Sequence, residues 1–121
     1  MKILIVEDEP LVSWSIAQNL KKEGHATIIA DDGKTALELI KKLHFDLVIT
    51  DLDLPYASGF EIASVVKSLH LEIPVILITA YRGKILPNDH RIRYFDYIID
   101  KPIDFTELRA LIQSSVFQPS K

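Results

Sequence analysis

Short apolar runs alternate along the chain with longer segments in which apolar residues recur every three or four positions. Most of the runs are nearly continuous in Ile, Val and Leu, which is typical of strands covered on both faces of a parallel sheet. They predict five strands, at Lys2–Val6, Ala26–Ala30, Asp46–Thr50, Pro74–Thr79 and Tyr97–Asp100. The amphipathic segments predict four helices, at about Pro10–Glu23, Lys34–Lys42, Phe60–Leu69 and Phe105–Val116.

Several of the predicted helix ends carry local signals. Pro10 suits a first helical position, and Gly24 suits the stop of the same helix. Asp104 is placed to cap the last helix, and Glu107 three residues later nearly completes a capping box. The segment Arg82–Arg93 is interrupted by glycine, proline and an Asn-Asp pair, so it predicts a short, irregular or mobile element.

The alternation of strands and helices predicts an α/β fold of the flavodoxin-like (βα)5 type. This fold is a three-layer sandwich around a parallel five-stranded sheet in the order 2-1-3-4-5. The 121 residues, 48% of them hydrophobic, suffice for one core. We therefore expect one domain over residues 1–117 and a tail or linker stub over residues 118–121.

Composition and charge exclude several classes of protein. A net charge of -3 argues against direct binding of nucleic acid, because the chain lacks a basic footprint. The absence of cysteine excludes disulfides and thiolate metal sites and is consistent with a reducing compartment. No apolar run is long enough to cross a membrane, and the first residues do not read as a secretion signal. We expect a cytoplasmic protein without membrane contact.

Acidic, hydroxyl and amine side chains stand at the ends of four of the predicted strands. Glu7 and Asp8 follow the first strand, and Asp51 follows the third. The fourth strand ends in Thr79, and Lys101 follows the fifth. Because parallel strands end at one edge of the sheet, these five side chains should converge there.

The converging groups suit phosphoryl transfer. Crowded carboxylates repel one another unless a cation lies among them, and carboxylate oxygens are ligands that Mg²⁺ prefers. With Mg²⁺ and Lys101 drawing charge from the phosphoryl oxygens, a carboxylate oxygen of Asp51 can attack phosphorus and form an acyl phosphate. Thr79 is placed to donate a hydrogen bond to a phosphoryl oxygen.

The same residues resemble the receiver domain of two-component response regulators, the CheY-like family. The resemblance covers essentially the whole chain, through MKILIVEDEP, DLVITDLDLPYASGFE, VILITAY and IIDKPID. It implies phosphorylation of Asp51 by a histidine kinase or a histidine phosphotransfer protein, and a conformational change around the fourth and fifth βα units. It also implies a downstream effector protein or domain and leaves open a homodimer that forms on phosphorylation. Such a domain is not an enzyme beyond its own phosphoryl uptake and loss.

The resemblance assigns further roles by position. Asp8 and Asp51 would bind Mg²⁺ directly, Glu7 through water and Asp53 through its backbone carbonyl. Thr79 would be the switch hydroxyl and Lys101 the phosphate-binding lysine. The family also has a cis peptide bond before a proline that corresponds to Pro102.

Two candidate positions for switching or partner contact differ from this pattern or lie outside it. The aromatic switch residue of the family corresponds to Ile98 here, and Tyr97, one residue earlier, should point to the opposite face of the sheet. On the first helix, Trp14 lies about 200° around the helical wheel from the apolar stripe. Trp14 is therefore either an exposed partner contact or partly buried under a neighbouring loop.

Two other interpretations remain open from the residues alone. The sequence Asp51-Leu52-Asp53 also resembles the nucleophile motif of haloacid dehalogenase-type phosphatases, although their additional acids follow the lysine whereas Glu7 and Asp8 precede everything here. The chain could also be a pseudo-receiver that has lost phosphorylation. The presence of Asp51, Thr79 and Lys101 argues against that interpretation, and Ile98 argues mildly for it.

Overall fold

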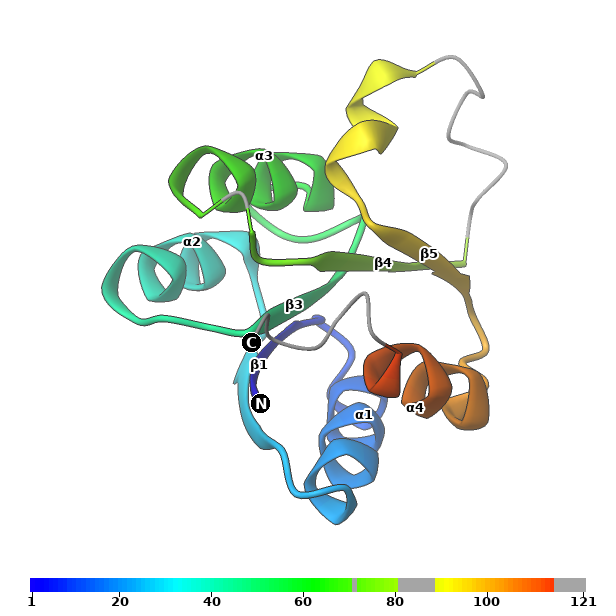
Figure 1. Cartoon of the computed structure of the whole chain (residues 1–121). Coiled ribbons are helices and arrows are strands. Elements are labelled where there is room, and N and C mark those ends of the chain that lie inside the picture. The colour runs from blue at the N-terminus through cyan, green and yellow to red at the C-terminus, as the bar shows by residue number, and fades with distance from the viewer. Residues whose placement is uncertain (71, 81–88, 115–121) are drawn as a thin grey trace.

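A parallel sheet runs through the part of the chain that the computed structural model describes, residues 1–70, 72–80 and 89–114. Five strands in this part pair in the order β2-β1-β3-β4-β5, as predicted (Figure 1). The strands are β1 (Lys2–Val6), β2 (Ala26–Ala30), β3 (Leu47–Asp51), β4 (Val75–Thr79) and β5 (Tyr97–Asp100). The helices are α1 (Pro10–Lys22), α2 (Gly33–Lys42), α3 (Gly59–Leu69), the 3-10 helix η2 (His90–Tyr94) and α4 (Phe105–Gln113).

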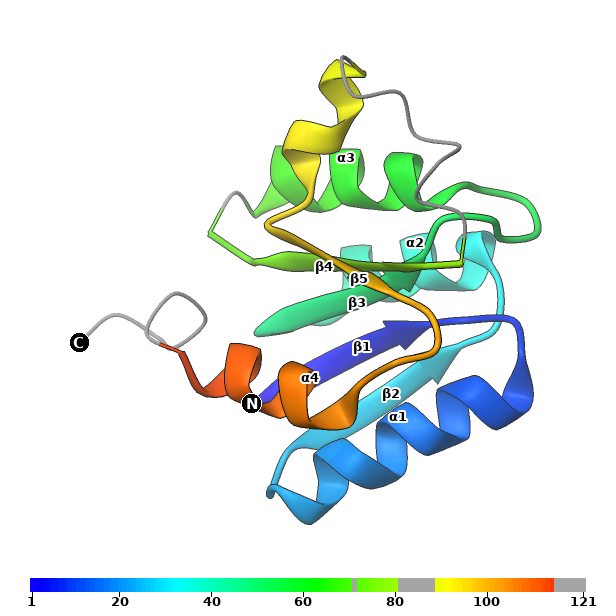
Figure 2. The same ribbon diagram turned by 90° about the vertical axis from the view of Figure 1, so that its right-hand side faces the viewer.

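The helices cover the sheet on both faces. Helices α1 and α4 lie on one face, and α2 and α3 lie on the other (Figure 2). Successive strand side chains point to opposite faces, so alternate residues of one strand enter different cores. In β1, Ile3 and Ile5 pack with α1 and α4, whereas Leu4 and Val6 pack with α2 and α3. Each such fully buried aliphatic side chain contributes about 1.5–3 kcal/mol to stability.

The helix signals act as expected. Gly24 has a φ of 87°, and its N–H donates to the carbonyl of Lys21 at 3.0 Å, which ends α1. The carboxylate of Asp104 accepts the N–H groups of Thr106 at 2.9 Å and Glu107 at 3.3 Å, which starts α4. None of the helices in the described ranges is both long and apolar enough to span a membrane.

The last helix is shorter than predicted. It ends at Gln113 because Ser114 turns to an extended backbone, and both its N–H and its hydroxyl donate to the carbonyl of Leu111. A serine that satisfies a helical carbonyl with its side chain competes with further helix. The rest of the predicted helix, 115–116, and the predicted tail, 118–121, lie outside the described residues.

The irregular segment after β4 contains one short element in its described part. Residues 82–88 lie outside that part, and His90–Tyr94 form η2. The carboxylate of Asp89 accepts the backbone N–H of Arg91 at 3.0 Å and caps this turn. The prediction of a short element is thus confirmed for the residues that follow Asp89.

Candidate functional site

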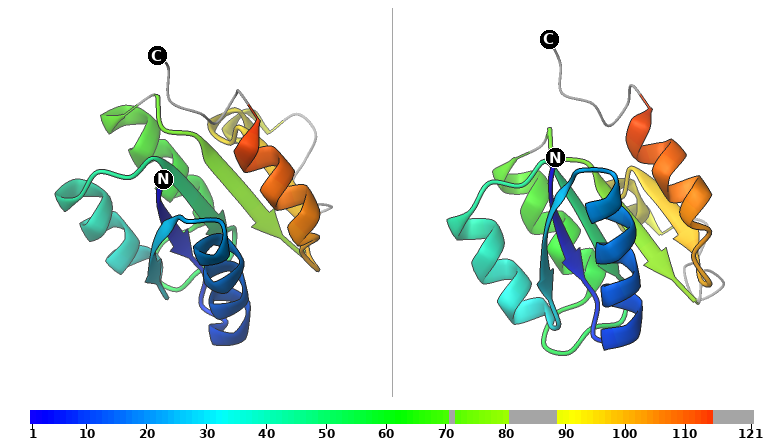
Figure 3. Two further views of the ribbon diagram at one scale, coloured as in Figure 1. Left: turned by 60° about the horizontal axis from the view of Figure 1, so that its bottom comes forward. Right: turned by 90° about the horizontal axis from the view of Figure 1, so that it is seen from below.

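Three carboxylates meet at the edge of the sheet where the strands end. The strand arrows point toward this edge in Figure 3. Strands β1 and β3 are neighbours with Val6 opposite Thr50, so the residues that follow, Glu7 and Asp51, are also adjacent. Oxygens of Glu7, Asp8 and Asp51 all lie within 4.8 Å of one another. The predicted convergence of the acids is confirmed.

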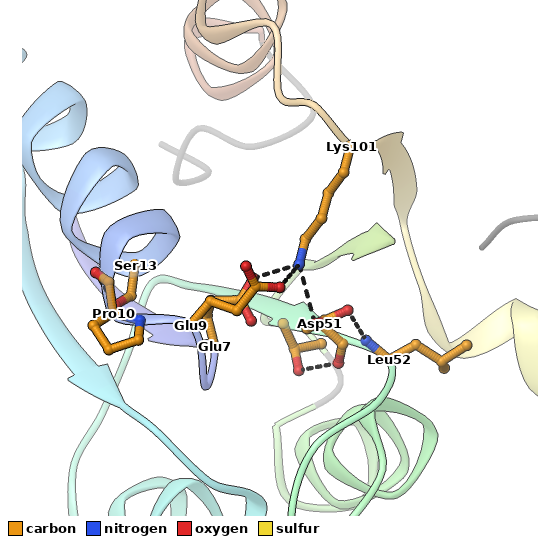
Figure 4. Close-up of polar contacts among 8 residues, drawn as sticks. Glu7, Glu9, Pro10, Ser13, Asp51, Leu52 and Lys101 are labelled. Atoms are coloured by element: carbon orange, nitrogen blue, oxygen red, sulfur yellow. Dashed lines mark hydrogen bonds and ion pairs between the residues drawn. The ribbon is translucent and has the colours of Figure 1, made fainter. Parts of the chain in front are cut away.

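The ammonium group of Lys101 lies among these acids (Figure 4). Its Nζ donates to Oε1 of Glu7 at 2.6 Å and to Oδ2 of Asp51 at 3.2 Å. It also lies 3.7 Å from Oε1 of Glu9, which the motif analysis did not single out. Glu9 directly follows Glu7 and Asp8 in the loop after β1, and this run of three acids was the available signal.

The carboxylate of Asp51 is held in one orientation. Its Oδ1 accepts the backbone N–H of Leu52 at 2.7 Å, while Oδ2 faces Lys101. Behind it, the N–H of Gly59 at the start of α3 donates to the carbonyl of Leu52 at 2.8 Å. The Asp51 carboxylate is thus fixed from two directions, so a reaction at this group would need little reorganisation.

Replacing Gly59 with Ala should destabilise the protein. A Cβ at this position would collide with the backbone carbonyl oxygen of Asp51 and lie 3.0 Å from Cα of Leu52. Relief requires a shift of α3 away from the end of β3, so we expect a loss of about 1–3 kcal/mol in the free energy of unfolding. Urea denaturation measures the loss. Ser68→Ala, at an exposed position late in α3, serves as the control and should change stability by less than about 0.5 kcal/mol.

Glu7 is the electrostatically unusual member of the site. Only 3% of the residue is exposed, and its Oε2 has no hydrogen-bond partner among the described residues. Burial raises the pKa of Glu7 to about 7, against a lowering effect of the hydrogen bond from Lys101 and with a further raising effect of the charge on Asp51. The single positive charge of Lys101 therefore offsets the negative charge of the clustered acids only in part.

Lys101 keeps its charge in this setting. Burial would lower the pKa of its ammonium group, but the hydrogen bond to Glu7 and the charge of Asp51 outweigh burial and raise that pKa. The buried and unpaired oxygen of Glu7 and the all-oxygen donor set together fit a hard divalent cation. The site thus combines the fixed positive charge of Lys101 with a cluster of oxygens that can hold a divalent cation.

A pocket of about 230 Å³ opens above these groups. Its lining residues are Asp8, Glu9, Asp51, Asp53, Ala80 and Lys101. Thr79 is buried, and the small Ala80 that follows it lines the pocket in its place. The N–H of Lys101 donates to the carbonyl of Thr79 at 3.0 Å, so the ends of β4 and β5 are joined directly below the pocket. The peptide bond between Lys101 and Pro102 is cis, as the family resemblance implied.

Comparison with known proteins identifies the family of the chain. The family model for the response regulator receiver domain matches residues 3–113. The chain belongs to this family. This membership confirms the resemblance seen in the sequence and decides against the phosphatase family as its origin.

The receiver domain resembles both curated proteins and solved structures. It is 34% identical to the regulatory protein AtoC of Escherichia coli K12. The alignment covers 95% of this chain and 25% of AtoC. It is 35% identical to the transcriptional regulatory protein PcoR of Escherichia coli, with 93% of the chain and 50% of the relative covered. The chain therefore spans between a quarter and a half of these curated relatives.

Among solved structures, the response regulator TrrA of Thermotoga maritima, in complex with Mg²⁺ and BeF, has 30% identity and a TM-score of 0.84. The alignment covers 93% of this chain and 96% of TrrA. A CheY-like receiver domain from Methanospirillum hungatei has 28% identity and a TM-score of 0.87, with 95% and 92% covered. Both likenesses extend over more than nine tenths of the chain and support the flavodoxin-like fold.

The two switch candidates on β5 point to opposite faces, as predicted. Ile98 packs into the core under α2 and α3 and lies beside Leu77 of β4. Tyr97 is 43% exposed and has the same parity as Ile99, which enters the core under α1 and α4. Tyr97 therefore does not substitute for an aromatic ring at position 98 of this receiver domain.

An apolar groove lies beside the acidic pocket, between the start of α1 and the loop before α4. Its volume is about 540 Å³, and its lining residues are Leu11, Val12, Ser15, Ala80, Lys101, Pro102, Ile103 and Phe105. It shares Ala80 and Lys101 with the pocket, so groove and pocket are continuous. Trp14 on α1 is 58% exposed and Leu11 is 75% exposed, which confirms the exposed alternative for Trp14.

Proposed function

We propose that this receiver domain accepts a phosphoryl group on Asp51 in a Mg²⁺-dependent reaction. The donor in this proposal is a phosphohistidine of a histidine kinase or histidine phosphotransfer protein. The observation that carries it is the Asp51 carboxylate itself, fixed by the Leu52 N–H and the Lys101 ammonium at the floor of an open acidic pocket. An effector protein or domain would receive this signal, because response regulators act through such partners.

The proposed reaction transfers a phosphoryl group from the imidazole of the donor to the carboxylate of Asp51. A carboxylate oxygen of Asp51 forms a bond to phosphorus while the bond from phosphorus to the imidazole nitrogen of the donor breaks. The departing imidazole takes up a proton. Lys101 stabilises the negative charge on the phosphoryl oxygens from its position between Glu7 and Asp51, and the Thr79 hydroxyl donates to one of these oxygens after the phosphoryl group arrives.

The acids around Asp51 suit a metal ion. Glu7, Asp8 and Asp51 are the carboxylates that would hold Mg²⁺, together with the backbone carbonyl of Asp53, which lines the same pocket. When bound, the ion would offset the carboxylate charges and bind a phosphoryl oxygen. The TrrA structure contains Mg²⁺ and BeF on a fold of the same kind, which supports this assignment.

We further infer that the chain is not an enzyme acting on other substrates. It would catalyse only its own phosphoryl uptake and loss, because the acyl phosphate on Asp51 is the product that carries the signal. The response would be a conformational change around the fourth and fifth βα units. The link between the Lys101 N–H and the Thr79 carbonyl supports this, because it connects the phosphoryl-binding lysine to the end of β4.

The groove beside the pocket, together with the exposed part of α1 at Leu11 and Trp14, is the proposed docking surface for the donor protein. A donor must bring its phosphohistidine to Asp51, and the groove leads to the pocket through Ala80 and Lys101. The exposed side chains of Leu11 and Trp14 provide the kind of apolar and aromatic area that dominates binding energy in interfaces. A helix of the donor protein against α1 would bury both.

Trp14→Ala should slow phosphoryl transfer from a phosphorylated histidine kinase by tenfold or more, because a large aromatic contact is lost from the interface. Uptake from acetyl phosphate, which needs no protein contact, should stay unchanged. The two transfer rates measured on the same preparations separate docking from chemistry. Leu69→Ala removes an exposed apolar side chain elsewhere and should affect neither rate. An unchanged kinase rate in Trp14→Ala would exclude this docking surface.

A further inference from the structure

A second cluster of ionisable side chains lies at the edge of the sheet where β3 and β4 begin, opposite to the phosphorylation site. Helices α2 and α3 both end at this edge (Figure 2). The same order of residues, a Leu-His pair and then an acid two positions after the histidine, stands at the end of each helix. These residues are Leu43, His44 and Asp46 directly after α2, and Leu69 at the last position of α3 with His70 and Glu72 after it.

The two histidines meet in space although 26 positions separate them in the sequence. Strands β3 and β4 are neighbours in the sheet, so the segments that enter them run side by side. The ring centroids of His44 and His70 lie 5.9 Å apart, with the ring planes at 89°. No regular spacing in the sequence would have shown this pair.

Each histidine has a carboxylate beside one of its ring nitrogens. Nε2 of His44 lies 3.7 Å from Oδ1 of Asp46, and Nδ1 of His70 lies 3.8 Å from Oε1 of Glu72. Asp46 is itself fixed, because its other oxygen accepts the backbone N–H of Lys2 at 2.7 Å. The ring nitrogens turned away from the acids, Nδ1 of His44 and Nε2 of His70, are the ones left for a ligand.

The acids lie near the positions that carboxylates take beside metal-bound histidines in proteins, although 3.7 and 3.8 Å are longer than hydrogen bonds. A metal-bound imidazole usually donates its second N–H to a carboxylate, which sets the tautomer and the ring orientation. Zn–N bonds of about 2.0–2.1 Å place the centres of two imidazoles on one ion roughly 5 Å apart. The side chains of His44 and His70 are 64% and 39% exposed, so both rings have room to turn toward a shared ion.

We propose that His44 and His70 together bind a divalent transition metal ion such as Zn²⁺, with Asp46 and Glu72 orienting the two rings. Imidazole nitrogens prefer Zn²⁺, Ni²⁺ or Cu²⁺, whereas the all-carboxylate cluster around Asp51 prefers Mg²⁺. The two acids also offset the charge of the ion. The site is independent of the proposed phosphorylation, since it lies a full strand length from Asp51.

Titration of the intact chain with Zn²⁺, in saturating Mg²⁺ and without a phosphodonor, tests this proposal. Calorimetry should show one site in the wild type, and His44→Ala and His70→Ala should each weaken it tenfold or more. Glu72→Gln should weaken it less, because the acid only orients the ring. His90→Ala removes an exposed histidine elsewhere in the described part of the chain and is the matched control.

A second readout guards against variants that fail to fold. Circular dichroism of each metal-free variant establishes that the sheet is intact. Zn²⁺ should then raise the melting temperature of the wild type and of His90→Ala in full, that of Glu72→Gln by less, and those of His44→Ala and His70→Ala little or not at all. Absence of Zn²⁺ binding by the wild type would overturn the proposal. Equal Zn²⁺ affinity of the wild type and His44→Ala would overturn it as well.

Discussion

Asp51→Asn should abolish phosphorylation of this receiver domain. With acetyl phosphate and Mg²⁺, the wild type should gain one phosphoryl group, visible in the intact mass, and the variant should stay at background. The amide of Asn is a far weaker nucleophile than the carboxylate that Lys101 and Leu52 hold in place. The substitution keeps the shape of the side chain, so the loss reports on chemistry rather than on folding.

Asp53→Asn is the matched control for this experiment. Asp53 lines the same pocket and lies two positions away, but only its backbone carbonyl has a proposed role, so most of the phosphorylation should remain. Full modification of Asp51→Asn would overturn the assignment of the acceptor. A wild type that takes up no phosphoryl group, with Mg²⁺ present, would favour the pseudo-receiver interpretation. Turnover of many phosphoester molecules by one chain would contradict the proposal that the domain modifies only itself.

Glu7→Gln should stabilise the metal-free protein above neutral pH. The pKa of Glu7 is about 7 in the folded protein against 4.5 for the ordinary group, so the folded state binds this proton more tightly than the unfolded state. By linkage, the free energy of unfolding of the wild type falls as pH rises from 4.5 to about 7. The full loss is about 3 kcal/mol, and Gln, which never ionises, avoids it.

Urea denaturation at pH 5 and pH 8 in the presence of a chelator measures this effect. The variant should exceed the wild type by up to about 3 kcal/mol at pH 8 and by little at pH 5, because Glu7 is then protonated in the wild type. Glu9→Gln changes an exposed acid of the same loop and is the control for the loss of one negative charge there. An equal advantage of Glu7→Gln at both pH values would contradict the raised pKa. The same variant should bind Mg²⁺ more weakly, because one carboxylate of the cluster has lost its charge.

Most of the fold was predictable because the local signals agree with the tertiary structure. The bounds of β1, β2 and β5 match the prediction, since continuous β-branched runs flanked by turn residues leave few alternatives. The error at the end of α4 has a local cause. Apolar periodicity continued to Val116, but the side chain of Ser114 bonds to the last turn and ends the helix earlier, which periodicity does not report.

Most residues of the candidate site were predictable from the sequence. Glu7, Asp8, Asp51 and Lys101 follow strands, and right-handed crossovers bring all strand ends to one edge, so their proximity followed from topology. The same argument pointed to Thr79, but its burial, with Ala80 rather than Thr79 lining the pocket, depends on how the end of β4 packs. Glu9 was missed because its distance from Lys101 depends on the path of a loop.

The sequence by itself determined the order of the elements and the residues at the strand ends, because these depend on periodicity and on short-range chain geometry. The exposure of Trp14, which the sequence left open, was decided by the structure. Only the tertiary structure decided which charges are buried together. Glu7 lies with one oxygen unpaired beside Lys101, and His44 meets His70, because neighbouring strands bring distant segments into contact. Desolvation and pairing depend on all surrounding atoms, and no local pattern encodes them.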